Sequence, residues 1–203
     1  YVDLGGNCFA NTCEDQNGDG VPDECGFGDD GILTVCADGC DFSSLDIALQ
    51  VAADGDRIEI GSGTYETEFA HVIDRSIEIV GAEDGSTQII GSTRWTVSGS
   101  ANLALASIAI TMGGFDVDPE ATLTLEECLV TGIVIYAGGP FIEASAAGAR
   151  VVLRECVFES CVISQGGIFD AVFIAASDLV VEDVVVRSCS LIGANSYFFR
   201  PVI

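Results

Sequence analysis

The chain has 203 residues, enough for one core or one solenoid, and no apolar run reaches the roughly 18–20 residues that a bilayer span requires. Its formal net charge is −25, with 32 acidic residues against seven Arg and no Lys. This surface excludes nucleic acid as a partner, because phosphate binding needs clustered Lys and Arg, and it favours cations or basic partners.

Cysteine is abundant, whereas His71 is the only histidine, so zinc-type Cys/His spacing is missing. The nine cysteines are Cys8, Cys13, Cys25, Cys36, Cys40, Cys128, Cys156, Cys161 and Cys189. Disulfides in an oxidising compartment are a better interpretation than metal thiolates, and the odd number leaves one thiol free or paired between chains. Because the first residue is Tyr, we expect a processed product whose signal peptide is gone, and an extracellular or cell-surface location.

Residues 1–31 form an arm rich in Gly, Asn, Asp and Cys, which we expect to depend on ligands and disulfides rather than on a core. Within it, DQNGDGVPDEC (15–25) places oxygen-bearing side chains at alternate positions, as an EF-hand loop does. The predicted Ca²⁺ ligands are Asp15, Asn17, Asp19, the Val21 carbonyl and Asp23, with Glu24, Asp29 or Asp30 completing the shell.

The twelfth loop position is Gly26, where an EF-hand has a bidentate Glu. The sequence therefore predicts a weak, extracellular type of calcium site, with a dissociation constant of roughly 10⁻⁴–10⁻³ M. The alternative is an Asx-rich turn that is closed by Cys13 and Cys25 without a metal.

From residue 32 the composition changes to that of an all-β protein with one helix. ILTV (32–35) and DRIEI (56–60) are predicted strands, and SSLDIALQVAA (43–53) is a predicted helix with Ser43 or Ser44 as its N-cap. Apolar residues follow one face of this helix: Leu45, Ala48, Leu49 and Ala52. Short apolar strands separated by Gly, Ser, Asp and Asn follow.

The last third of the chain repeats every 28 residues, over 122–149, 150–177 and 178–203. The matching columns are Leu123/Val151/Leu179, Leu125/Leu153/Val181, Ile135/Ile163/Leu191, Phe141/Phe169/Tyr197, Cys128/Cys156 and Cys161/Cys189. Leu105 and Ile108 fit the same phase in a coil of 20 residues. This pattern predicts a parallel β-helix in which each repeat is one coil and each column is a ladder spaced about 4.8 Å apart.

The segment 32–90 resembles the opening of the right-handed parallel β-helix, pectin-lyase-like superfamily. The shared features are a strand, a helix, Gly55–Asp56 before a strand, Gly63–Thr64–Tyr65, and the run from Ser76 to Gly81. The resemblance implies this fold over about 32–203, with the helix covering the open end of the first coil. It implies no activity, because the shared residues belong to the scaffold. NGDGVPDEC in the arm resembles the calcium-bound Asp-rich repeats of secreted bacterial proteins and of thrombospondin type 3 modules.

The repeats also stack groups that carry chemistry. Cys36 and Cys40 flank ADG (37–39) and are expected to close a small disulfide loop before the helix. Cysteines on adjacent coils are close enough for disulfide staples, and a buried thiol ladder is the alternative. Glu127, Glu155 and Asp183 form one acidic column beside Glu126, Arg154 and Glu182. We expect a solvated face in which Arg154 and water relieve the repulsion; a bound cation is the alternative.

Catalysis has less support, because related polysaccharide-cleaving enzymes use Asp clusters with a Lys, Arg or His that this pattern does not supply. Hydrolysis by two carboxylates requires them to lie roughly 5–10 Å apart. Glu126 and Glu155 could meet this distance by accident, as many pairs on an acidic face would. Trp95, Tyr65 and Tyr136 are candidates for stacking on sugar rings. Enzymatic activity is left open, with these observations against it.

The third repeat breaks off at SYFFRPVI with no polar closing helix, and an open coil exposes strand edges. We therefore expect either a fragment of a longer protein or a secreted, calcium-stabilised structural protein. The latter would self-associate head-to-tail, through the open end and the N-terminal arm, into a filament or surface layer. The alternative function is a non-catalytic or lyase-like module acting on acidic polysaccharide.

Overall fold

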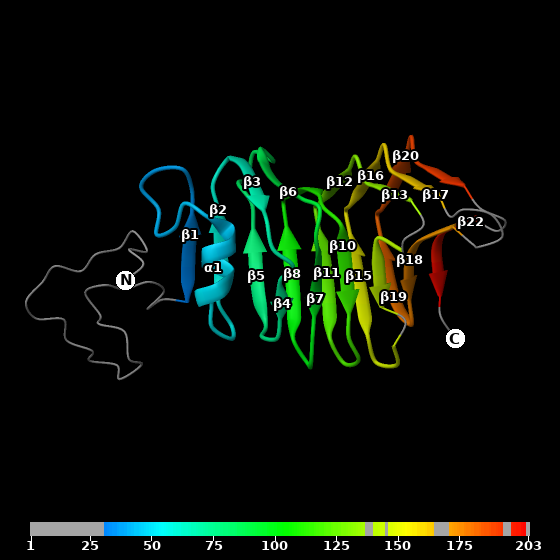
Figure 1. Ribbon diagram of the computed structural model, residues 1–203, viewed down its shortest axis with the longest axis horizontal. Coiled ribbons are helices and arrows are strands. Elements are labelled where there is room, and N and C mark those ends of the chain that lie inside the picture. Colours follow the sequence, from blue (N-terminus) through cyan, green and yellow to red (C-terminus); the bar gives the residue numbers. More distant parts are fainter. Residues whose placement is uncertain (1–30, 137–139, 145, 165–170, 193–195, 202–203) are drawn as a thin grey trace, which may run out of the picture.

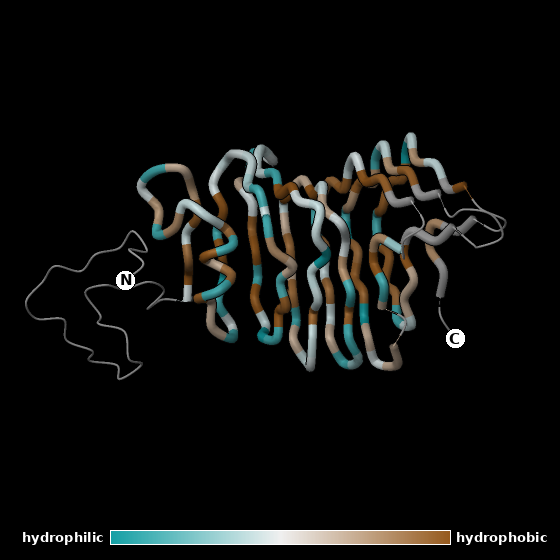
Figure 2. The backbone as a smooth tube through the Cα atoms, in the orientation of Figure 1, coloured by the Kyte–Doolittle hydropathy of each residue, from teal (hydrophilic) through white to brown (hydrophobic). Residues whose placement is uncertain are grey.

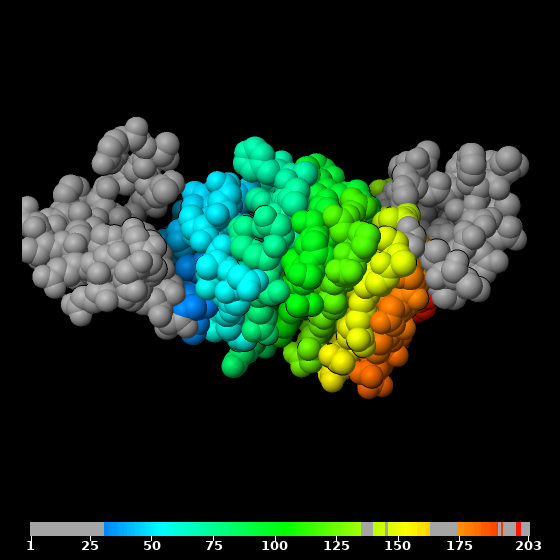
Figure 3. Space-filling view, turned by 90° about the horizontal axis from the view of Figure 1, so that it is seen from below, coloured from blue at the N-terminus to red at the C-terminus, as the bar shows by residue number. Residues whose placement is uncertain are grey.

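The computed structural model describes residues 31–136, 140–144, 146–164, 171–192 and 196–201, which form a parallel β-solenoid of about six turns (Figure 1). Successive turns lie side by side along the long axis, so that the sequence colours follow one another in bands across the surface (Figure 3). Each turn therefore contacts mainly its neighbours, as expected for a solenoid. Within the described residues, no helix is long and apolar enough to cross a membrane.

In the described part of the chain, four parallel sheets, named A to D here, form the walls of the solenoid. Sheet A contains β1 (Ile32–Val35), β2 (Arg57–Ile60), β5 (Ile77–Val80), β8 (Asn102–Ala106), β11 (Thr122–Glu126), β15 (Arg150–Arg154) and β19 (Asp178–Glu182). Sheet B contains β3 (Gly63–Thr67), β6 (Thr87–Gly91), β9 (Ala109–Thr111), β12 (Leu129–Thr131), β16 (Val157–Glu159) and β20 (Val185–Arg187). Sheet C contains β4 (Val72–Ile73), β7 (Arg94–Val97), β10 (Gly114–Val117), β14 (Ile142–Ala144), β18 (Ala171–Ala176) and β22 (Ser196–Pro201). Sheet D contains β13 (Val134–Tyr136), β17 (Val162–Ser164) and β21 (Ser190–Ile192).

Alternation of apolar and polar residues sets which face of each strand is buried. In β11, Leu123 and Leu125 point into the solenoid and are fully buried, whereas Thr122 and Thr124 are half-buried on the outside. This period of two is the signature of a strand with one face against a core. Figure 2 shows the result as hydrophobic stretches that recur along the strands, with hydrophilic residues frequent at the turns.

The predicted 28-residue columns are paired in register in sheet A. Leu123 pairs with Val151, and Val151 with Leu179. The shorter turn is also as predicted, because Leu105 pairs with Leu125. Ladder hydrogen bonds thus align repeats of different length, since the extra residues are accommodated in the connections between strands.

Sheet C departs from the repeat, and the predicted aromatic column Phe141/Phe169/Tyr197 is wrong. Tyr197 pairs with Val172 in the structure, and Phe169 lies outside the described residues. The connections from sheet D to sheet C differ in length from turn to turn (β13 to β14, β17 to β18, β21 to β22), so a constant offset cannot align this wall.

The helix α1 (Leu45–Val51) is shorter than the predicted 43–53. Ser44 precedes it in an extended conformation (φ −131°, ψ 128°), and its side chain makes no capping hydrogen bond. Ala52 leaves the helical conformation at φ −53°, ψ 136°. Leu45 and Leu49 are buried on the face that packs against the first turn beside β1 and β3 (Figure 1).

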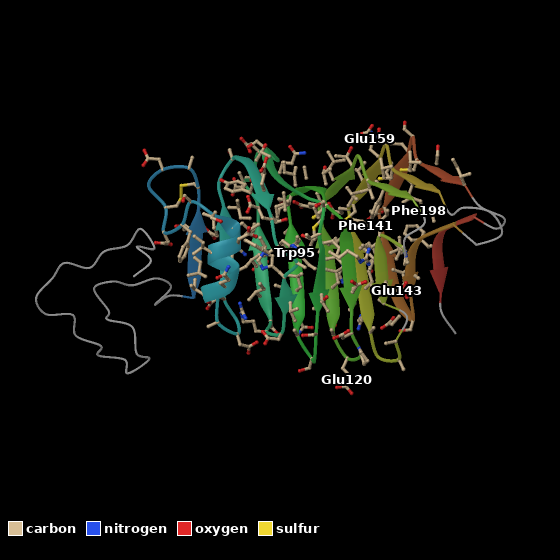
Figure 4. All side chains as sticks on the ribbon, in the orientation of Figure 1. Trp95, Glu120, Phe141, Glu143, Glu159 and Phe198 are labelled. Carbon is tan, nitrogen blue, oxygen red and sulfur yellow. A yellow bond between two sulfur atoms is a disulfide. The ribbon has the colours of Figure 1, made fainter. Side chains whose placement is uncertain are left out.

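An aromatic stack runs through the interior along sheet C. His71, Trp95, Phe115 and Phe141 meet edge-to-face, with successive ring centroids 5.5, 6.2 and 5.7 Å apart. Trp95 and Phe141 lie between the sheet walls in Figure 4, and both are fully buried. Such edge-to-face pairs contribute on the order of 0.5–1.5 kcal/mol each beyond their buried area, and they couple successive turns.

Candidate functional site

The predicted calcium ligands lie outside the residues that the structure describes: Asp15, Asn17, Asp19, Val21, Asp23 and Glu24, together with Cys8, Cys13 and Cys25. Among the described residues, no group of three or more His, Cys, Asp or Glu side chains is placed to hold a metal ion. The calcium site of the arm therefore stays a prediction.

The front edge of sheet A is closed by a small disulfide loop. Cys36 and Cys40 are bonded, with their Cα atoms 5.5 Å apart, which confirms this pair of the predicted disulfide cysteines. The Thr34 amide donates to Asp41 Oδ2 at 2.8 Å, and the Phe42 amide donates to the Thr34 carbonyl at 3.0 Å. These bonds occupy the outer edge of β1, so this strand does not offer its Thr34 groups to another chain.

Three polar contacts fasten α1 to the first turns, and the one between His71 and Asp46 is buried. His71 Nε2 lies 2.6 Å from Asp46 Oδ1, and the Glu68 amide donates to Asp46 Oδ2 at 3.2 Å. The side chains of His71 and Asp46 are each only 9% exposed. Arg75 Nη2 donates to the Leu49 carbonyl near the end of the helix. His71 is thus enclosed in the scaffold, where its observable role is to anchor the helix.

At the rear of the described solenoid, inward positions of the last strands are exposed. Val181 is 40% exposed, although its pairing partner Leu153 in the preceding turn is fully buried. In the same way, Val186 is 41% exposed and its partner Phe158 is fully buried. These inward positions are exposed because, within the described residues, no strand pairs on the far side of β19 or β20.

Further apolar side chains surround this end. Val185 in β20 and Ile192 in β21 are 49% and 57% exposed. The strands β19, β20, β21 and β22 each stand at the edge of their sheet in the described structure, so one side of each backbone has no ladder partner there. Unpaired strand edges next to exposed apolar residues are a template for a further strand. We call β19–β22 the rear turn, and it is the candidate interaction site.

A column of exposed acidic turn residues runs between sheets A and B. Glu127, Glu155 and Asp183 adopt left-handed φ values of 52°, 50° and 51°, and Ser107 in the preceding turn has 56°. This conformation is uncommon for residues other than glycine, so its recurrence shows one turn geometry copied from coil to coil. The Ser107 hydroxyl donates to Glu127 Oε2 at 3.0 Å.

Arg154 relieves the repulsion next to this column, as one of the sequence alternatives predicts. It pairs in register with Glu126 and Glu182, and its Nε donates to Glu182 Oε2 at 2.8 Å. The hydrogen bond to Glu182, followed by the attraction of its charge, raises the pKa of Arg154. Both side chains are about half exposed, so the pair lies on a solvated face.

Ion pairs between adjacent turns engage most of the basic residues. The pairs that link neighbouring turns are Arg57–Glu78, Arg94–Asp116, Arg150–Asp178, Arg154–Glu182 and Arg187–Glu159. Since the chain carries 32 acidic residues and seven Arg, most carboxylates have no basic counterpart. The excess of carboxylates therefore makes the surface attractive to cations, with no one sheet preferred.

Four further cysteines among the described residues are free thiols in this structure. Cys128, Cys156 and Cys161 are buried, and Cys189 is partly exposed. A side-chain hydrogen bond with Cys156, then burial, raises the pKa of Cys128. The same hydrogen bond lowers the pKa of Cys156.

The aromatic residues predicted to stack on sugars do not form an exposed platform. Trp95 is fully buried and Tyr65 is only 9% exposed, because both occupy inward positions of their strands. Burial raises the pKa of the Tyr65 hydroxyl. The side chain of Tyr136 lies outside the description. The prediction of a sugar-stacking role is thus wrong for Trp95 and Tyr65.

A shallow hollow of about 360 Å³ lies over β1, β2 and β5. Its lining includes Arg57, Glu59 and Glu83. Arg57 donates to Glu78 Oε2 at 2.7 Å and to Glu59 Oε1 at 3.0 Å, and these hydrogen bonds raise its pKa. Because the Arg57 guanidinium is already paired with these two carboxylates, the hollow is poorly suited to bind an anionic substrate.

Comparison with known proteins gives no match: no family model, no curated protein and no solved structure is similar to the chain. The class of the protein accordingly rests on its own strand pairing, which over the described residues defines a parallel β-solenoid with one short helix and a Cys36–Cys40 disulfide.

Proposed function

We propose that this protein is a secreted, calcium-stabilised structural protein that associates head-to-tail into an extracellular filament or surface layer. The observation that carries the proposal is the contrast between the two ends of the solenoid. Thr34 at the front edge is hydrogen-bonded by the loop at 41–42, whereas Val181 and Val186 at the rear are exposed.

The finer description of the fold belongs to this proposal. We take the solenoid to be right-handed and pectin-lyase-like, because parallel strands joined by a crossover are right-handed in nearly all cases. In this description α1 is a cap, with Leu45 and Leu49 covering the interior of the first turn. A capped front, together with the exposed apolar positions in the last described strands, gives the particle a direction.

Head-to-tail contact between such particles joins two different surfaces and, unless it closes into a ring, produces a filament. Because the Thr34 groups of β1 are occupied, the element that covers the rear turn of a neighbour is proposed to be the arm 1–31 rather than β1. Calcium in the loop at 15–24 would order this arm and neutralise part of the −25 charge where copies meet.

Negative-stain electron microscopy of the native protein, with and without chelator, tests the proposal. We expect filaments in calcium that shorten or fray when calcium is removed. Asp19→Ala should weaken assembly in the same way, because it removes a predicted ligand.

A valine pair separates an end contact from a general effect of added charge. Val186→Asp, at the uncovered rear turn, should abolish filaments, whereas Val134→Asp, at a 51% exposed position on the side wall, should leave them intact. Dispersed particles in every condition would refute assembly, and binding to acidic polysaccharide would then be measured instead.

A further inference from the structure

Cys161 and Cys189 occupy equivalent positions in the last two turns. The pairs on either side of them, Glu159 with Arg187 and Val162 with Ser190, are in parallel register. The Cys161 amide donates to Cys189 Sγ at 3.4 Å, so the sulfur of one turn lies against the backbone of the other. Neighbouring strands are about 4.8 Å apart, inside the usual range of roughly 4.4–6.8 Å for the Cα atoms of a disulfide.

The two turns are also held in this register beside the cysteines. Arg187 Nε and Nη2 donate to Glu159 Oε1 and Oε2 at 3.0 and 3.1 Å. This two-point contact restrains sliding of one turn along the other. The geometry thus favours a disulfide between Cys161 and Cys189 over a disulfide from either one to a more distant cysteine.

Position in the solenoid distinguishes this pair from Cys128 and Cys156. Those two thiols are 1% and 0% exposed, and Ile108 and Val184 occupy the same column in the turns on either side. Stacked Cβ atoms are about 4.8 Å apart, whereas a disulfide brings them to roughly 3.5–4.5 Å, so one turn must shift. The rear turn can shift, since no strand of the described residues pairs on its far side.

Solvent accessibility also distinguishes Cys161 and Cys189 from Cys128 and Cys156. Cys189 is partly exposed, and its neighbours Ser188 and Ser190 are exposed. A dissolved reagent therefore reaches Cys189 in the folded protein, while Cys128 and Cys156 are sealed until the solenoid opens.

We propose that Cys161 and Cys189 form a reversible disulfide that staples the rear turn to the turn before it, with a low-molecular-weight disulfide such as oxidised glutathione as the oxidant. The site needs neither calcium nor assembly, and it is tested on the unassembled chain, because a neighbour seated on the rear turn would cover Cys189.

The reaction takes two exchange steps. The Cys189 thiolate attacks one sulfur of the oxidant, forming a mixed disulfide and releasing one glutathione thiolate. Cys161 then loses its proton and attacks Cys189 Sγ, which releases the second glutathione. Two protein thiols are oxidised to one disulfide, and one glutathione disulfide is reduced to two thiols.

The order of attack follows from the surroundings of Cys161. Burial, followed by the charge of Cys189, raises the pKa of Cys161 to about 12, so the first nucleophile is Cys189. Once Cys189 is in the mixed disulfide, it carries no thiolate charge and no longer opposes ionisation of Cys161.

Peptide mapping under non-reducing conditions tests the proposal on the folded, full chain after incubation with oxidised glutathione. The expected product is a Cys161–Cys189 link, with Cys128 and Cys156 still reduced. Cys161→Ser should trap glutathione on Cys189, and Cys156→Ser should leave the link unchanged. In the linked protein, amide hydrogen exchange in β20 and β21 should slow on the order of tenfold or more, because their local opening is restrained.

Four outcomes would overturn the proposal. The first is glutathione that stays on Cys189 of the unmodified chain, which would show that Cys161 cannot reach it. The second is a Cys128–Cys156 link that appears equally early, and the third is a link from Cys189 to any other cysteine. An absence of reaction at Cys189 in the folded chain would refute its accessibility.

Discussion

Two valines allow one chemical change to be compared in a covered turn and in the rear turn. Val151 in β15 is fully buried, whereas Val181 in β19 is 40% exposed. Val→Ala removes two carbons, worth about 1.6 kcal/mol at about 0.8 kcal/mol per buried methylene. At Val151 a cavity term adds to this, so we expect a loss of about 2–3 kcal/mol in the free energy of unfolding.

At Val181 the removed carbons are already part solvated, and the open side leaves no enclosed cavity. The expected loss is about 1 kcal/mol or less. The loss in free energy of unfolding should be smaller still when it is measured with a probe in the middle of the solenoid, because an end turn can open while the other turns stay folded. The single tryptophan, Trp95, is fully buried in β7 and provides this probe.

The measurement is urea unfolding of Val151→Ala and Val181→Ala, followed by Trp95 fluorescence and by far-ultraviolet circular dichroism, over a range of protein concentrations. At low concentration the first variant should be the less stable by at least 1 kcal/mol. A loss at Val181 that grows with concentration would support assembly through the rear turn. Equal losses at every concentration would refute the reasoning, because Val181 would then be covered within each copy.

Three further predictions concern contacts between turns. Asp46→Ala should lower the free energy of unfolding by about 1–3 kcal/mol, measured by urea unfolding, because it leaves buried His71 without its partner. Arg94→Lys should lower it by a similar amount, about 1–3 kcal/mol, since Arg94 donates to three backbone carbonyls and to a carboxylate on the next turn, a geometry that lysine cannot reproduce. Hydrogen bonds from the Ser86 side chain and backbone lower the pKa of Asp84 below 3.8, so their stabilisation is present above that pH and is lost as pH falls through the folded-state pKa. Ser86→Ala should therefore be less stable than the parent chain at neutral pH, and stability curves measured against pH should converge in acid.

The class of fold was predictable from local pattern. Alternation in segments such as TLTLE (122–126) and the 28-residue repeat predict stacked parallel strands, and both depend only on which residues must face a core. The disulfide between Cys36 and Cys40 was predictable in the same way, because a spacing of four residues confines the two sulfurs.

The candidate site was predictable only in outline. An open final coil could be expected from the sequence, but its exposed valines, including Val186, are identified by comparison with their buried partners. The enclosed Asp46–His71 contact had no sequence signal, since 25 residues separate its members. The nearest indication that His71 faces the interior is its edge-to-face contact with Trp95, one turn later in the chain.

The sequence by itself determined the period of the strands, the inward residues of sheet A and the position of one helix, because these follow from alternation and spacing along the chain. The tertiary structure alone decided the register of sheet C, the burial of Trp95 and the placement of partly exposed Cys189 beside buried Cys161. Each of these depends on how long the connections are and on what the neighbouring turn places above a residue. The contacts Ser107–Glu127 and Arg154–Glu182 join residues 20 and 28 positions apart, so the repeat predicts which residues stack across turns, but not how their side chains pack.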